Sequence, residues 1–144
     1  MLTDLVRLFP DLPKEGYLRT SDPSIDYNCV AWAAGDDKQW WEPDRMGLFH
    51  WPAGVRREWN TQSLSAVFQA QKYILCADGT HEHGYEKIAI YAKQGVPTHV
   101  ARQLPGGRWT SKLGPLDDIT HTLDGLAGKE YGQPHRFLRR QLSL

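Results

Sequence analysis

The second half of the chain carries three runs with the residue types and spacing of β-strands. They span Glu86–Lys93, Thr98–Leu104 and Arg108–Leu113. Residues 94–97, Gln-Gly-Val-Pro, join the first two runs, and residues 105–107, Pro-Gly-Gly, join the last two. Connections this short link antiparallel neighbours, so the sequence predicts an antiparallel meander.

The first half carries helix signals and loops instead. Asp26 or Asn28 can cap a short helix over residues 29–34, and Asn60 or Thr61 can cap a second one. The segment between them is rich in tryptophan, proline and glycine and has no sustained period. It is therefore expected to be a long structured loop.

Two further segments follow the meander. Residues 117–126 are expected to form a helical turn or short helix, and residues 135–141 a final strand whose arginines protect an exposed sheet edge. Helical signals within residues 1–73, followed by an antiparallel sheet, predict an α+β fold. The length suits one domain covering residues 1–144.

Composition excludes several classes of partner. There are 17 Lys and Arg against 17 Asp and Glu, so no net field attracts nucleic acid or anionic lipid. The mean hydropathy is -0.56, and no apolar run is long enough to span a membrane. The N-terminus lacks a secretory signal pattern, so we expect a cytoplasmic protein, possible export by a dedicated secretion system being left open. The protein is expected to be a monomer.

Cys29 stands where the first helix is expected to begin. Free N–H groups and the helix dipole at such a position favour the thiolate, and a nearby imidazole such as His99 can complete the activation. A buried structural role is the ordinary alternative for either residue. Cys76 lacks comparable surroundings and is expected to be a core thiol, unpaired in a reducing compartment.

Short motifs around both residues resemble a known family. Tyr27-Asn28-Cys29 is followed by small and apolar residues, and 88–91, 99–101 and 106–109 follow as strand, histidine strand, and glycine turn with the next strand. The pattern is similar to that of NlpC-type cell-wall peptidases and amidases, within the papain-like superfamily that includes the CHAP amidases. The resemblance implies a papain-like α+β fold, with the helical half packed on the sheet.

The resemblance also implies a catalytic set for amide hydrolysis. Cys29 would attack the acyl carbon, and His99 would protonate the departing amine before activating water to clear the thioester. A third polar residue is expected about a dozen residues beyond the base, where Ser111 has the matching spacing. Its hydroxyl can accept the imidazole N–H and fix the tautomer. Asp118 is the runner-up for this position because a carboxylate also stabilises imidazolium.

Donors to the oxyanion and a substrate cleft can be suggested by position. The backbone N–H of Cys29 is one candidate donor, with the Tyr27 hydroxyl or the Asn28 amide as a second. Trp40 or Trp41 could line a cleft, although tryptophans clustered in a loop more often seal a core.

Alternatives remain at this point. The same thiol could transfer an acyl group to an amine, or the domain could be an inactive binding module with a tryptophan-lined groove. The substrate could be a cell-wall peptide, a protein side-chain amide or an isopeptide. Residues 81–83, His-Glu-His, carry side chains that can bind zinc. The flanking glycines favour a solvated turn instead, so no metal and no cofactor are expected.

Overall fold

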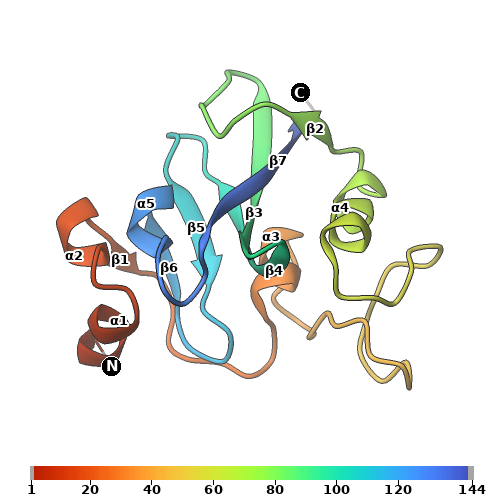
Figure 1. Cartoon of the computed structure of the whole chain (residues 1–144), viewed down its shortest axis with the longest axis horizontal. Coiled ribbons are helices and arrows are strands. Elements are labelled where there is room, and N and C mark those ends of the chain that lie inside the picture. Colours follow the sequence, from red (N-terminus) through yellow and green to blue (C-terminus); the bar gives the residue numbers. More distant parts are fainter. Residues whose placement is uncertain (1, 143–144) are drawn as a thin grey trace.

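The computed structural model describes residues 2–142, and within them seven strands form a single sheet (Figure 1). Neighbouring strands are antiparallel at every pairing. In sheet order the strands are β1 (Leu18–Arg19), β6 (Asp118–His121), β5 (Trp109–Lys112), β4 (Val96–Gln103), β3 (Tyr85–Lys93), β7 (Gln133–Gln141) and β2 (Ile74–Cys76).

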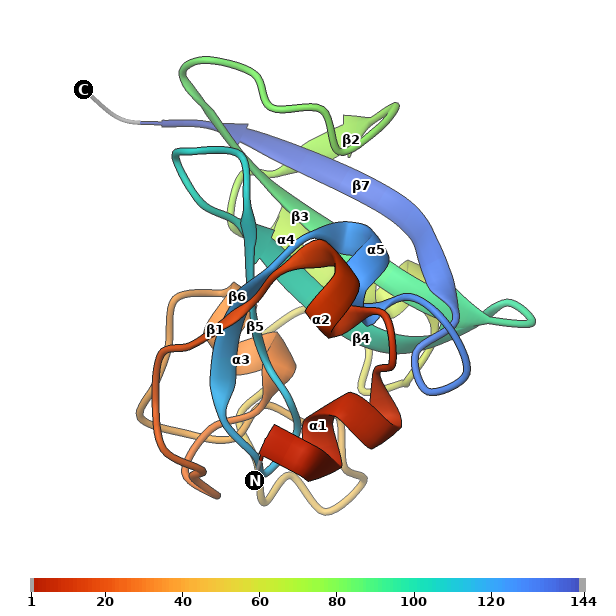
Figure 2. The ribbon, with the colours of Figure 1, turned by 90° about the vertical axis from the view of Figure 1, so that its left-hand side faces the viewer.

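Five short helices cover the sheet within the described residues. They are α1 (Leu2–Leu8), α2 (Leu12–Glu15), α3 (Cys29–Ala33), α4 (Thr61–Gln69) and α5 (Leu123–Leu126). Figures 1 and 2 show α1, α2 and α5 on one face of the sheet and α3 and α4 on the other. We call these the α1 face and the α3 face. Helices of this length are marginal alone, so packing on the sheet stabilises them. No described helix has the length and apolar character needed to cross a membrane.

Alternate residues of the central strands enter two separate cores. Ile88 and Ile90 of β3 pack on the α3 face with residues of α3 and α4. Ala89 and Tyr91 pack on the α1 face with residues of α1, α2 and α5. Because both faces are covered, the centre of β3 is apolar on both sides, which explains its continuous apolar run.

The predicted meander is confirmed as β3, β4 and β5. Gln94 and Gly95 form the turn between β3 and β4, with φ of 51° and 81°, and the adjacent residues Lys93 and Val96 pair. Two successive residues with positive φ match the turn that suits the right-handed twist of a two-residue hairpin.

The expected α+β, papain-like class with an N-terminal helical half is wrong. Before residue 74 the helices are only seven, four, five and nine residues long. Residues 36–60 form a loop with no helix, held by tryptophan side chains and a bridge between Trp41 and His50. The fold is therefore β-rich: one antiparallel sheet with short helices on both faces.

Two local expectations also need correction. Residues 118–121 form strand β6 ahead of α5, where a helical segment was expected. Residues 133–141 do form a strand, but β7 lies between β3 and β2 and not at the edge. Its arginines pair with side chains of neighbouring elements, Arg139 with Glu82 and Arg140 with Glu86.

Candidate functional site

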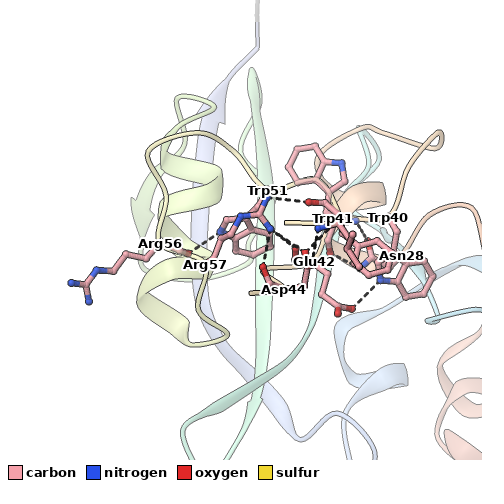
Figure 3. Close-up of polar contacts among 10 residues, drawn as sticks. Asn28, Trp40, Trp41, Glu42, Asp44, Trp51, Arg56 and Arg57 are labelled. Atoms are coloured by element: carbon pink, nitrogen blue, oxygen red, sulfur yellow. Dashed lines mark hydrogen bonds and ion pairs between the residues drawn. The ribbon is translucent and has the colours of Figure 1, made fainter. Parts of the chain in front are cut away.

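Asn28 holds the start of α3 against the loop that follows it (Figure 3). Its Oδ1 accepts hydrogen bonds from the backbone N of Ala31 at 3.2 Å and of Trp41 at 3.1 Å, and its Nδ2 donates to the Trp41 carbonyl at 2.7 Å. An aspartate could not make the last bond, because a carboxylate has no donor. The amide thus caps the helix and fixes Cys29 as its first residue.

The thiol of Cys29 lies in a buried environment, although the residue as a whole is partly exposed. Burial raises the pKa of this thiol above its usual value. The backbone N–H groups of Val100, Val30 and Cys29 itself, and the charge of Lys112, act in the opposite direction. Burial outweighs them, so the resting group is a neutral thiol and not the thiolate expected from its position on the helix.

His99 is fully buried on the α1 face of β4. Its ring stacks on Tyr131 with centroids 4.2 Å apart and planes 6° from parallel, and it meets the ring of Tyr91 edge-on at 5.6 Å. Burial lowers the pKa of His99 well below its usual value, and the proximity of His121 lowers it further. The imidazole is therefore neutral.

A line of hydrogen bonds runs from His99 across β5 to β6. His99 Nε2 lies 2.8 Å from Ser111 Oγ, which lies 2.7 Å from His121 Nε2, and His121 Nδ1 lies 2.6 Å from the carbonyl oxygen of Thr122. All three side chains are fully buried, and we call this set the histidine relay (His99, Ser111, His121). The spacing that singled out Ser111 in the sequence corresponds to a direct hydrogen bond. Nδ1 of His99 has no hydrogen-bond partner among the described residues.

Cys29 and His99 approach β4 from different sides. Val100 packs with α3 on the α3 face, whereas the side chain of His99 lies with Ala101 on the α1 face. The N–H of Val100 acts on the Cys29 thiol, and that nitrogen is bonded directly to the carbonyl carbon of His99. In the part of the chain that the structure describes, no hydrogen bond joins the thiol to the imidazole. The two residues are thus neighbours through the β4 backbone, but they do not form a bonded pair in this structure.

Asp118 lies on the α3 face and takes no part in the histidine relay. It accepts hydrogen bonds from the hydroxyl of Tyr27, at 2.6 Å, and from the hydroxyl of Thr20. Burial and this carboxylate together raise the pKa of Tyr27 to about 12. The structure therefore brings Asp118 to Tyr27 and not to His99, and it commits the Tyr27 hydroxyl to a structural bond.

The tryptophans of the loop are held mainly by packing and by bonds of their indole N–H groups. Trp41 is buried, donates to Asp36 at 2.8 Å and meets the ring of His50 edge-on at 4.5 Å. Trp40 is partly exposed and donates to Glu42 at 3.1 Å. Trp51 is buried and donates to the carbonyl of Arg56 at 2.8 Å. Trp41 and Trp51 also belong to the core on the α3 face.

A pocket of about 750 Å3 opens beside Asn28 along this loop. We call it the Trp41 pocket; its lining residues include Asn28, Trp41, Glu42, Arg45, Arg57 and Trp59. The guanidinium of Arg57 shapes one wall by binding the Asp44 carboxylate and the Phe49 carbonyl, each at 3.1 Å (Figure 3). Cys29 and His99 are not among its lining residues.

Within residues 2–142, no three His, Cys, Asp or Glu side chains lie close enough together to hold a metal ion. Residues 81–83 lie in the connection between β2 and β3. There the Glu82 carboxylate pairs with Lys87 at 3.2 Å and with Arg139. It is therefore already neutralised by two cations.

His121 is the member of the site that sequence reasoning missed. The sequence did contain a signal: His121 lies two residues after Ile119, so on a strand both side chains face the same core. Residues 117–126 were instead expected to be helical, and that error hid the alternation.

Residues 18–139 match the family described as Domain of unknown function (DUF7689). The matched span runs from β1 into β7 and contains Cys29 and the whole histidine relay. No curated protein and no solved structure matches the chain.

Proposed function

The chain belongs to the DUF7689 family, and we propose that it is a thiol hydrolase of amide bonds, with Cys29 as nucleophile and His99 as base. One observation carries the proposal: the buried imidazole of His99 is held by Ser111 at Nε2 and has no partner at Nδ1, and the backbone N–H that acts on the Cys29 thiol belongs to the next residue, Val100. A buried polar atom without a partner is costly, and such atoms occur preferentially at functional sites.

The protonation states define the chemistry. With a neutral thiol and a neutral imidazole, Nδ1 of His99 accepts the S–H proton while sulfur attacks the acyl carbon. The C–N bond then breaks, and the imidazolium returns the proton to the departing amine. In the second half, Nδ1 takes a proton from water as its oxygen attacks the thioester. The C–S bond breaks, and the sulfur recovers the proton.

The proposal requires the thiol and imidazole to approach each other when an acyl group binds, because in the resting structure they lie on different sides of β4 and no hydrogen bond joins them. Catalytic hydrogen bonds are often long or poorly aligned before substrate binds and tighten only in the complex.

Of the suggested oxyanion donors, the backbone N–H of Cys29 is the one the proposal retains. As the first residue of α3 it has no carbonyl one turn earlier to bind. The Tyr27 hydroxyl already donates to Asp118, and the Asn28 amide to Trp41. These two side chains hold the site in place instead.

An acyl-transfer assay tests this function. Incubation with p-nitrophenyl acetate should release p-nitrophenol in a burst and leave an acetyl group on Cys29, located by mass spectrometry of the quenched protein. We expect His99→Asn to slow acylation by about 10²- to 10⁴-fold, because the general base is lost.

Cys76 is the internal control for this assay. It was expected to be a core thiol, but it lies partly exposed on the edge strand β2, so it reports the reactivity of a thiol without a base. Cys76→Ser should leave the burst unchanged, and Cys29→Ala should abolish it. Acetylation confined to Cys76 would contradict the proposal.

A binding module is the second candidate function, and the position of the Trp41 pocket favours it. The pocket opens beside Asn28 and not over the thiol, and the same loop exposes Met46, Leu48 and Trp59. Exposed apolar side chains around a partly polar pocket suit an extended peptide. If the protein is a binding module, p-nitrophenyl acetate should leave Cys29 unmodified. An added peptide should then shift the NMR resonance of the Trp59 indole N–H.

A further inference from the structure

The far end of the histidine relay fixes the position of every proton in it. His121 Nδ1 lies 2.6 Å from the Thr122 carbonyl oxygen, which can only accept, so Nδ1 carries the hydrogen. Burial lowers the pKa of His121 to about 4, so the ring is neutral at pH 7 and has a single N–H. Its Nε2 is therefore bare and must accept.

The proton of Ser111 follows from this. Ser111 Oγ lies 2.7 Å from the bare Nε2 of His121, and its one hydrogen is donated there. Toward His99 Nε2, at 2.8 Å, the hydroxyl can then offer only a lone pair. His99 must donate, so its proton is on Nε2 and its Nδ1 is the free acceptor.

We infer that His121 is a positioning residue, which acts through Ser111 to hold His99 in the tautomer with a bare Nδ1. The opposite direction of the relay would need a proton on both nitrogens of His121, and a fully buried imidazolium has no carboxylate partner in the relay to stabilise it. The histidine relay fixes the tautomer of His99, as a carboxylate does for the imidazole of other catalytic sites, and it does so without a buried charge.

The inference depends on Ser111 and His121 together, which lie on the neighbouring strands β5 and β6. Ser111 alone could serve His99 either as donor or as acceptor, because a hydroxyl rotates. Only the bare Nε2 of His121 removes that freedom. That the bare Nδ1 serves as a base rests on the proposed function, whereas the tautomer itself does not.

Side-chain ¹⁵N NMR of the histidines at pH 7 tests the inference without any substrate. In the wild-type protein we expect His99 protonated at Nε2 and His121 protonated at Nδ1. In His121→Leu the Ser111 hydroxyl loses its acceptor and can turn toward His99, which should then populate the Nδ1–H form. His121→Gln, which restores an acceptor for Ser111, should return His99 to the Nε2–H form.

Acylation of Cys29 provides the second readout. We expect it to slow by about 10- to 100-fold in His121→Leu and to recover in His121→Gln, because an imidazole in the wrong tautomer is not a base. Wild-type His99 protonated at Nδ1, or an unchanged tautomer in a folded His121→Leu variant, would overturn the inference; if that variant does not fold, the wild-type spectrum alone decides. The expected tautomers together with no acylation of the wild-type enzyme would support the inference and refute the hydrolase.

Discussion

Asn28 illustrates how much of this site depends on the donor and acceptor pattern of single side chains. Its one oxygen serves both the helix and the loop, while its nitrogen holds the Trp41 carbonyl. Because Trp41 in turn lines the pocket, this amide links the position of Cys29 to the shape of the Trp41 pocket.

Asn28→Asp should therefore lower the free energy of unfolding by about 1–3 kcal/mol, since a buried carbonyl loses its donor and meets a carboxylate. Urea denaturation at pH 7 measures this. Asn60→Asp is the matched control: Asn60 caps α4 through the Ser63 N–H, and its amide nitrogen reaches only the exposed Glu58. We expect a change of about 0.5 kcal/mol or less there. Equal losses in both variants would contradict the role assigned to the Asn28 amide.

The sequence alone predicts one contact of this site but not the state of its thiol. The spacing between His99 and Ser111 reflects two paired strands, and it predicted a contact that the structure contains. The state of the Cys29 thiol was not predictable, because burial is a tertiary property and here outweighs the helix start. The relevance of His121 was also hidden, since its bond to Ser111 depends on the pairing of β5 with β6.

The turn of the hairpin between β3 and β4 contains a residue type that is poorly suited to its backbone conformation. Gln94 is exposed and adopts φ of 51°, a left-handed conformation that asparagine tolerates better than glutamine. Gln94→Asn should raise the free energy of unfolding by about 0.5–1 kcal/mol, because Asn-Gly is the preferred sequence for this turn.

Thermal and urea denaturation measure this gain. Gln69→Asn, the same change at an exposed position of α4, should be slightly destabilising because asparagine is a poorer helix former. A gain at both positions would indicate a general effect of the substitution and not a turn effect.

Elements with local signals were predicted and those with tertiary causes were not. Alternation and glycine turns are local, and they identified β3, β4 and β5. The position of β7 was mistaken because its arginines suggested edge protection, whereas Arg139 and Arg140 pair with carboxylates of the β2–β3 connection and of β3. The two-residue strand β1 has no pattern of its own and exists through its pairing with β6.

For the whole molecule, the two relay histidines make stability depend on pH. Each has a folded pKa below the ordinary value near 6.5, so below pH 6.5 the unfolded chain binds protons that the folded protein excludes. Their contribution is present above pH 6.5 and is lost as the pH falls. For His121, with a folded pKa of about 4, the loss between pH 7 and pH 5 amounts to about 2 kcal/mol.

Urea denaturation at both pH values measures this loss. His121→Gln should remove its share of the decrease, leaving that of His99. A stability that is the same at pH 7 and pH 5 in the wild-type protein would contradict burial of the neutral imidazoles.

The position of β7 between β3 and β2 has a consequence for the order of folding. β2 is made first, yet the strand with which it pairs, β7, lies some 60 residues later in the chain. While a ribosome is still synthesising the intervening segment, the backbone groups of β2 have no strand to bind. The sheet can therefore be completed only when β7 emerges, and a nascent chain stalled before that point would leave β2 unpaired and the outer edge of β3 open to other polypeptides.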